Sequence, residues 1–264
     1  MDRDTLTLAE FNAAKAAHRQ TARAAGALDE GSARPQKAPV RADLPTLRYG
    51  GKTFAEWEQE LLTELEPASR IQAIEAIRAF GLNGNAHEAI RAISHVVSAS
   101  EDSTVFDAAC QTLQAFGPPS VPILIEGFTQ NKKHRGSAAG ALGQIGPEAI
   151  EALPVLFEAG REGNDPAPPS LGYALANIAL GDEASARMLA EAIEHAQSTV
   201  RGGIVNALAF TAATQPDRVV PLLLLALRDR KIDIRRVAAL ALATHAPSEQ
   251  VVVDGLKRAI HDQT

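Results

Sequence analysis

Few residues in this chain have the types and spacing that chemistry on a substrate would require. One histidine is followed directly by a glutamate, at His87-Glu88, and imidazole and carboxylate groups are common metal ligands. A two-iron centre needs several such pairs, and none of the other six histidines precedes a glutamate. We therefore interpret His87 and Glu88 as surface residues of a helix and expect no metal site.

The single cysteine, Cys110, is the second group with potential chemistry. It cannot form a disulfide within the chain, and alone it cannot build a cysteine-based zinc site. Its place in the helical pattern described below is an interior one, where a free cysteine behaves as a small apolar residue. We expect a buried, structural thiol.

Familiar motifs of catalysis, nucleic-acid binding and membrane insertion are missing from the sequence. The sequence has no glycine-rich phosphate loop, nucleophile elbow or zinc-binding helix motif, so we expect no enzymatic activity and no bound cofactor. The net charge of -6 argues against a nucleic-acid partner, which would require a basic surface. No apolar run could span a bilayer, and the N-terminus lacks the apolar core of a secretory signal. We expect a soluble, cytoplasmic protein with no membrane partner.

The elements that would position any site are helices. Aromatic residues make up only 4% of the chain and alanine is abundant, a composition typical of closely packed helices. In Arg135–Gly146, the residues Arg135, Ala138, Leu142 and Ile145 recur on one side of a helix with 3.6 residues per turn. The same frame returns at intervals of 29 to 36 residues, which predicts repeats of two helices each. With Leu142 as the reference, the equivalent apolar positions are Ile77, Leu113, Leu142, Leu175, Leu208 and Leu242.

Glycine and proline punctuate this period. Prolines precede or begin several predicted helices, and Gly81, Gly117, Gly146 and Gly181 follow predicted ends, where a left-handed cap is easiest for glycine. The first helices of the pairs are predicted at about 53–64, 86–98, 119–129, 148–160, 183–196, 217–228 and 248–262. The second helices are predicted at about 68–80, 103–116, 134–145, 169–179, 199–212 and 232–245.

The chain is predicted to have two parts. Residues 1–45 form an N-terminal tail with a short helix at about 8–25 and a flexible linker rich in glycine, proline and charge. Residues 46–264 form the repeat domain. Thr53 and Glu56 have capping-box spacing and mark the beginning of its first helix.

The repeated pattern resembles the HEAT-repeat superfamily, in particular the short HEAT-like repeats named after the phycobilisome lyases. The resemblance is carried by Arg70–Gly81 and Arg135–Gly146, and more loosely by the pairs Val200-Arg201 and Ile234-Arg235 with the residues after them. It covers about residues 53–262 and implies an all-α fold. The expected architecture is a right-handed α-solenoid of about six HEAT-like two-helix repeats plus a closing helix.

The resemblance also implies a function and a role for an arginine column. Four of the six repeats have arginine seven residues before the reference position, at Arg70, Arg135, Arg201 and Arg235. In HEAT arrays such arginines bond the turns or acidic groups of adjacent repeats. The usual role of the family is as a protein-binding scaffold or adaptor, which we expect here in a non-catalytic form. The alternative implied by the family is a lyase- or isomerase-type subunit acting on a tetrapyrrole-linked protein.

A binding surface follows from the helical period. Positions two before and two after each reference residue point away from the core, and in HEAT arrays the second helices usually line the concave side. The middle of this row is rich in amides, contains two aromatic residues and has little charge, as is common for protein interfaces. The predicted protein-binding residues are Gln111, Gln144, Tyr173, Asn177, Asn206 and Phe210.

Overall fold

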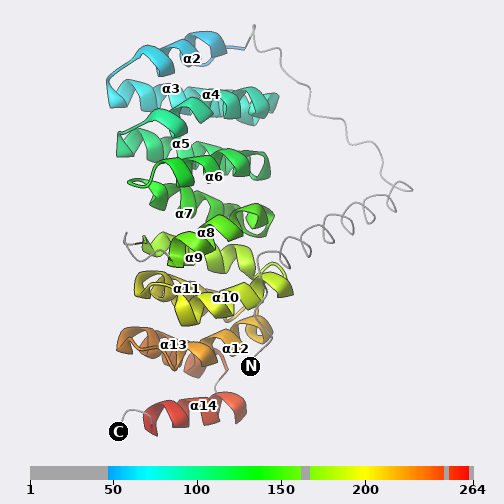
Figure 1. The fold of residues 1–264 in the computed structure, drawn as a ribbon. Coiled ribbons are helices and arrows are strands. Elements are labelled where there is room, and N and C mark those ends of the chain that lie inside the picture. Colours follow the sequence, from blue (N-terminus) through cyan, green and yellow to red (C-terminus); the bar gives the residue numbers. More distant parts are fainter. Residues whose placement is uncertain (1–46, 162–166, 247–249, 262–264) are drawn as a thin grey trace, which may run out of the picture. The chain divides into compact units, whose positions relative to one another are not determined.

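The computed structural model describes residues 47–161, 167–246 and 250–261, and every named element in them is a helix (Figure 1). This confirms the all-α fold. The predicted tail of residues 1–45, with its helix at 8–25, lies outside the described residues. Contacts divide the chain into two compact units, the first ending at Phe116 and the second beginning at Gly117, and each is described by itself.

In its described residues, 47–116, the first unit contains two helix pairs. Its elements are α2 (Phe54–Thr63), α3 (Pro67–Phe80), the π-helical turn η1 (Gly81–Asn85), α4 (Ala86–Ala99) and α5 (Ser103–Phe116). The predicted capping box begins α2: the Thr53 hydroxyl accepts from the Glu56 amide, and the Glu56 carboxylate accepts from the Thr53 amide at 2.6 Å. Both reciprocal bonds satisfy donors that a helix start otherwise leaves without partners.

A short turn covers Trp57 of α2. Tyr49 and Lys52 pair as an isolated bridge, and the Trp57 indole donates a hydrogen bond of 2.9 Å to the Tyr49 carbonyl. The Lys52 ammonium lies 4.2 Å from the centroid of the Trp57 ring, a cation–π arrangement. Trp57 is thereby only 3% exposed.

The second unit continues the alternation of first and second helices. In order, its elements are η2 (Pro118–Ser120), α6 (Val121–Gln130), α7 (Arg135–Ile145), η3 (Gly146–Ala152), α8 (Leu153–Arg161), α9 (Pro169–Ala179), α10 (Glu183–His195), α11 (Ser198–Thr211), α12 (Pro216–Ala226), α13 (Ile232–His245) and α14 (Gln250–His261). The second helices α7, α9, α11 and α13 pack successively against one another (Figure 1).

Two predicted helices begin with a 3₁₀ segment. The helix predicted at about 119–129 begins as the short segment η2, before α6 begins at Val121. The expected helix at 148–160 begins as the 3₁₀ segment η3 and becomes α-helical only at Leu153. The ring of Pro154 would clash with the carbonyl of Ile150 in a continuous α-helix, and its nitrogen has no hydrogen to donate. The chain therefore changes helix type immediately before this proline.

The four glycines predicted as left-handed caps serve two different purposes. Gly117 and Gly146 do have positive φ angles, of 73° and 76°. Gly81 has a right-handed φ of -60°, and Gly181 is not among the positive-φ glycines. A Cβ on Gly81 would lie 2.4 Å from the Phe116 ring, and one on Gly181 would lie 2.6 Å from Pro147. These two positions need glycine because neighbouring side chains occupy the space.

Glycines also bring the second helices of the second unit unusually close together. A Cβ on Gly172 of α9 would lie 2.1 Å from the Val200 carbonyl oxygen, and one on Gly203 of α11 would lie 2.3 Å from the Pro169 carbonyl oxygen. A Cβ on Gly143 of α7 would lie 2.7 Å from the Ala174 Cα. Because the obstructing atoms belong to the backbone, no side-chain movement can make room.

This packing predicts opposite effects for two glycine-to-alanine substitutions. Gly172→Ala should destabilise the protein by about 1–3 kcal/mol or more, because α9 and α11 must move apart to make room for the added Cβ. Gly140→Ala should stabilise it by about 0.5–1 kcal/mol, since Gly140 is helical with no atom within 4 Å of an added Cβ. Urea unfolding followed by circular dichroism measures both, and equal effects of the two substitutions would contradict the close backbone contact.

Candidate protein-binding face

The core positions of the second helices fix which residues face outward. Leu142, Leu208 and Leu242 are fully buried, and Leu175 is 3% exposed. Residues two before and two after these lie on the opposite side of each helix. We call this surface of the second unit the second-helix face; it comprises Gly140 and Gln144 on α7, Tyr173 and Asn177 on α9, Asn206 and Phe210 on α11, and Leu240 and Thr244 on α13.

Five of the six predicted binding residues belong to this face. Gln144 is exposed, Tyr173, Asn177 and Asn206 are half-buried, and Phe210 is 81% exposed. Their helices α7, α9 and α11 are packing neighbours. The sixth residue, Gln111, is exposed on α5 and belongs to the first unit. Its membership of the same site therefore stays a prediction.

The second-helix face has an apolar component that the sequence prediction left out. Leu240 on α13 is 69% exposed. It occupies an outward position of the same row as Phe210, and the prediction excluded it because only the middle of the row was considered. An apolar residue at an outward position was the signal available in the sequence.

The polar groups of the face are partly engaged within their own helix. The Asn206 amide nitrogen donates a 2.9 Å hydrogen bond to the Gly202 carbonyl, four residues earlier. Its carbonyl oxygen has no hydrogen bond to another residue in the part of the chain that the structure describes, and can accept one. The amide nitrogen of Asn206 thus fixes the side chain to its own helix, while the carbonyl oxygen can accept a hydrogen bond from a partner.

The three glycines within α7, Gly136, Gly140 and Gly143, have different surroundings. Gly140 is open, but Gly143 is buried against Ala174. The Gly136 carbonyl accepts a 2.9 Å hydrogen bond from the Ser170 hydroxyl. Two of the three glycines therefore serve the contact between α7 and α9.

An ion pair fixes the beginning of α11 relative to the next repeat. The Arg201 guanidinium binds the Asp229 carboxylate in a bidentate manner, with distances of 2.6 and 2.9 Å, and donates a third hydrogen bond of 2.7 Å to the Ala196 carbonyl. Arg235 donates to the Asp229 carbonyl at 2.8 Å. The predicted bonding between adjacent repeats is confirmed at Arg201, whereas Arg235 bonds the turn that precedes its own helix, α13.

The environment of Asp229 favours its charged form. Burial by itself would raise the pKa of this carboxyl group, since the side chain is almost inaccessible. Hydrogen bonds from Arg201 and the Lys231 amide, together with the charges of Arg201 and Arg235, outweigh burial and lower the pKa below its ordinary value of 3.8. Asp229 therefore stabilises the fold while it is ionised.

The groups with potential chemistry, Cys110, His87 and Glu88, belong to the first unit, whereas the second-helix face belongs to the second. Cys110 on α5 is 1% exposed, and burial, reinforced by the charge of Asp107, raises the pKa of its thiol to about 12. It is not available as a thiolate near neutral pH, as tetrapyrrole chemistry at this residue would require. On α4, His87 is exposed and Glu88 half-buried.

The described residues contain no group of three or more histidine, cysteine, aspartate or glutamate residues placed to hold a metal ion. Within the same ranges, every helix is too short or too polar to cross a bilayer.

The sequence matches no protein-family model and no curated protein. Among solved structures, it is similar to human deoxyhypusine hydroxylase, with 21% identity over 79% of this chain and 94% of that chain and a TM-score of 0.34. The described residues themselves show an all-helical fold of successive helix pairs.

This comparison corrects one expectation from the sequence. The matched protein is an enzyme, which contradicts the prediction that a chain of this kind is non-catalytic. The prediction rested on the absence of familiar motifs, a criterion that does not separate enzymes from scaffolds in this fold. At this level of similarity, no reaction or metal is carried over to the present chain.

The Arg201–Asp229 pair yields a prediction with a built-in control. Asp229→Asn should destabilise the protein by about 3–5 kcal/mol at pH 7, because Arg201 would keep a largely buried charge without its partner. Asp233→Asn removes an exposed pair with Arg236 and should cost about 1 kcal/mol or less. Chemical denaturation of both variants and the wild type measures the difference.

The difference in unfolding free energy between the wild type and Asp229→Asn should depend on pH. Because the folded-state pKa of Asp229 is lowered, its contribution is fully present above the unfolded-state pKa, about 3.9, and disappears as the pH falls through the folded value. The gap between wild type and Asp229→Asn should be constant from pH 7 to 5 and narrow below pH 4. A gap that stays constant down to pH 3 would rule out this role of the carboxylate.

Proposed function

We propose that this chain is a protein-binding scaffold or adaptor that holds a segment of a partner protein on the second-helix face. The observation that carries the proposal is the pair of exposed apolar side chains, Phe210 and Leu240, on the neighbouring helices α11 and α13. A single exposed apolar residue is ordinary, whereas two on one face, beside half-buried Tyr173, form a potential anchor site.

The surrounding groups complement such an anchor. Gln144, Asn177 and Asn206 carry amides that can both donate and accept hydrogen bonds, as the backbone of a bound segment requires. None of these residues is charged, so their desolvation costs less than that of ionised groups. Interfaces commonly combine aromatic anchors with a polar rim in this way.

The finer features predicted from the sequence belong to this proposal. They are a right-handed α-solenoid of about six repeats, a concave binding surface, and a cytoplasmic location. The regular succession of helix pairs within each unit supports the solenoid. The rigid contact between α9 and α11 supports a preformed surface, which reduces the entropy lost on binding.

Capture experiments with surface variants test the proposal. Full-length wild type, the double variant Tyr173→Ala/Phe210→Ala and the control Leu82→Ala are immobilised, and captured proteins are quantified by mass spectrometry. Leu82 is 61% exposed in η1 of the first unit, which makes it a matched apolar control. Thermal unfolding verifies that each variant is folded.

At least one protein captured by the wild type should be reduced about tenfold or more by the double variant, since anchor residues carry most of the energy of an interface. The control should capture it normally. If every captured protein is retained equally by the double variant, the second-helix face is not the binding surface.

A further inference from the structure

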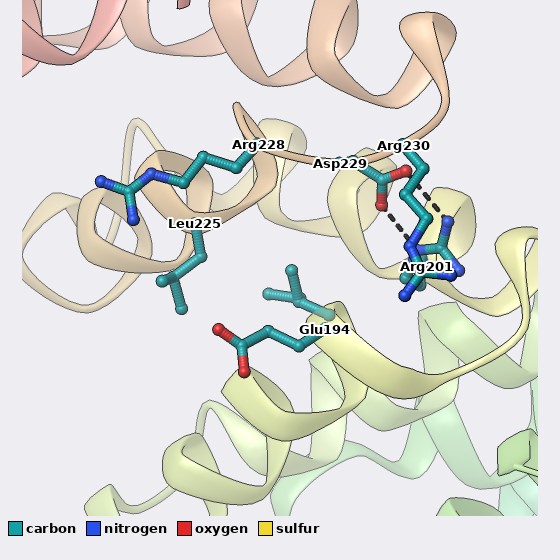
Figure 2. Close-up of a pocket in the computed structure, with 7 residues that line it drawn as sticks. Glu194, Arg201, Leu225, Arg228, Asp229 and Arg230 are labelled. Atoms are coloured by element: carbon teal, nitrogen blue, oxygen red, sulfur yellow. Dashed lines mark hydrogen bonds and ion pairs between the residues drawn. The ribbon is translucent and has the colours of Figure 1, made fainter. Parts of the chain in front are cut away.

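A cavity of about 180 Å³ lies on a different part of the second unit (Figure 2). It opens to solvent and is bordered by the end of α10, the beginning of α11, the end of α12 and the turn that follows. None of its residues belongs to the second-helix face. The lining residues are Ile193, Glu194, Arg201, Leu225, Arg228, Asp229 and Arg230.

The size and walls of the cavity limit what can enter it. Ile193 and Leu225 supply apolar walls, the first buried and the second half-buried. A cavity of about 150 Å³ can hold a benzene molecule, whereas sites for cofactors and drug-sized ligands usually exceed about 300 Å³. This cavity therefore suits one apolar side chain.

Of the charged groups around the cavity, two form an ion pair with each other and two arginines do not. Arg201 and Asp229 neutralise each other through their bidentate contact, which Figure 2 shows as dashed lines. Arg228 and Arg230 are exposed, and among the described residues their guanidinium groups have no hydrogen bond or ion pair.

The cavity carries an excess of positive charge. Glu194 opposes the two arginines at the rim, but its side chain is 57% exposed and lies 3.8 Å from the imidazole of His195. The excess is notable in a chain whose net charge is -6.

We propose that this cavity binds an acidic segment of a partner protein. An apolar side chain of the segment enters between Ile193 and Leu225. Figure 2 shows Arg228 and Arg230 on opposite sides of the cavity, so one carboxylate of the segment binds Arg228 and a second binds Arg230. Guanidinium groups match carboxylates in charge and in their paired hydrogen-bond geometry.

A polypeptide fits better than a small molecule because of where the groups lie. The apolar space accommodates one side chain, while Arg228 and Arg230 are exposed at its border. A ligand that uses both must continue beyond the cavity, as an extended peptide does. The charge complementarity selects an acidic peptide.

Peptide binding to the full-length protein tests the assignment. The probe is a fluorescein-labelled peptide with leucine at its centre and glutamate on both sides, and the reference probe replaces each glutamate with glutamine. Fluorescence anisotropy gives the dissociation constants for the wild type, Arg228→Glu/Arg230→Glu, and Leu225→Trp, which fills the cavity. The control Arg187→Glu changes an exposed arginine elsewhere on α10, with a side chain 63% exposed.

The wild type and the Arg187→Glu control should bind the glutamate peptide equally, with an affinity that falls as salt rises. Both cavity variants should bind the glutamate peptide about tenfold or more weakly than the wild type does. The wild type should bind the glutamine peptide no more tightly than the cavity variants bind the glutamate peptide. Thermal unfolding should be unchanged by the two exposed arginine substitutions.

Three results would overturn the proposal. They are equal binding of the glutamate and glutamine peptides, retention of binding in Arg228→Glu/Arg230→Glu, and absence of binding to the wild type. Tighter binding of inorganic phosphate, with exclusion of the peptide, would identify a phosphate site instead. None of these results depends on Tyr173 or Phe210, so the outcome is separable from that of the second-helix face.

Discussion

The backbone contact between α9 and α11 is the constraint on which the second unit depends. Gly172 and Gly203 meet across this contact, where a Cβ on Gly203 would lie 3.1 Å from the Gly172 Cα. Each glycine within a helix costs about 1 kcal/mol relative to alanine. Close packing of the two helices offsets that cost. It also fixes the positions of the residues that face outward from both helices.

Helix α11 combines three different roles along its length. Arg201 near its beginning joins it to the turn of the next repeat through Asp229, Gly203 allows its contact with α9, and Phe210 near its end is exposed. The helical period separates these roles onto different sides of one element. A single helix therefore contributes to the cavity, to the packed interior and to the proposed binding face.

The helix order could be predicted from the sequence because apolar period and punctuation agree. Leu142 and its equivalents are buried as expected, and Thr53 and Glu56 form the predicted capping box. The purposes of Gly81 and Gly181 could not be predicted in this way. A glycine needed for space looks the same in sequence as one needed for positive φ, and only the position of Phe116 or Pro147 distinguishes them.

The site could be predicted only in part, for a similar reason. Outward positions follow from the helical period, so Phe210 and Gln144 were identified. The cavity depends on Arg228 and Arg230 lying near Ile193, which is more than thirty residues away in sequence. Such proximity arises from the packing of α10 against α12, which no local pattern encodes.

Site-specific photocrosslinking in the native cells tests the central claim, protein binding by the second-helix face, most directly. A photoreactive phenylalanine analogue replaces Phe210 in one protein and Arg187, exposed on α10, in another. The account predicts that the analogue at 210 crosslinks to one reproducible protein that the analogue at 187 does not reach. Identical crosslinked proteins from both positions, or none from position 210, would contradict it.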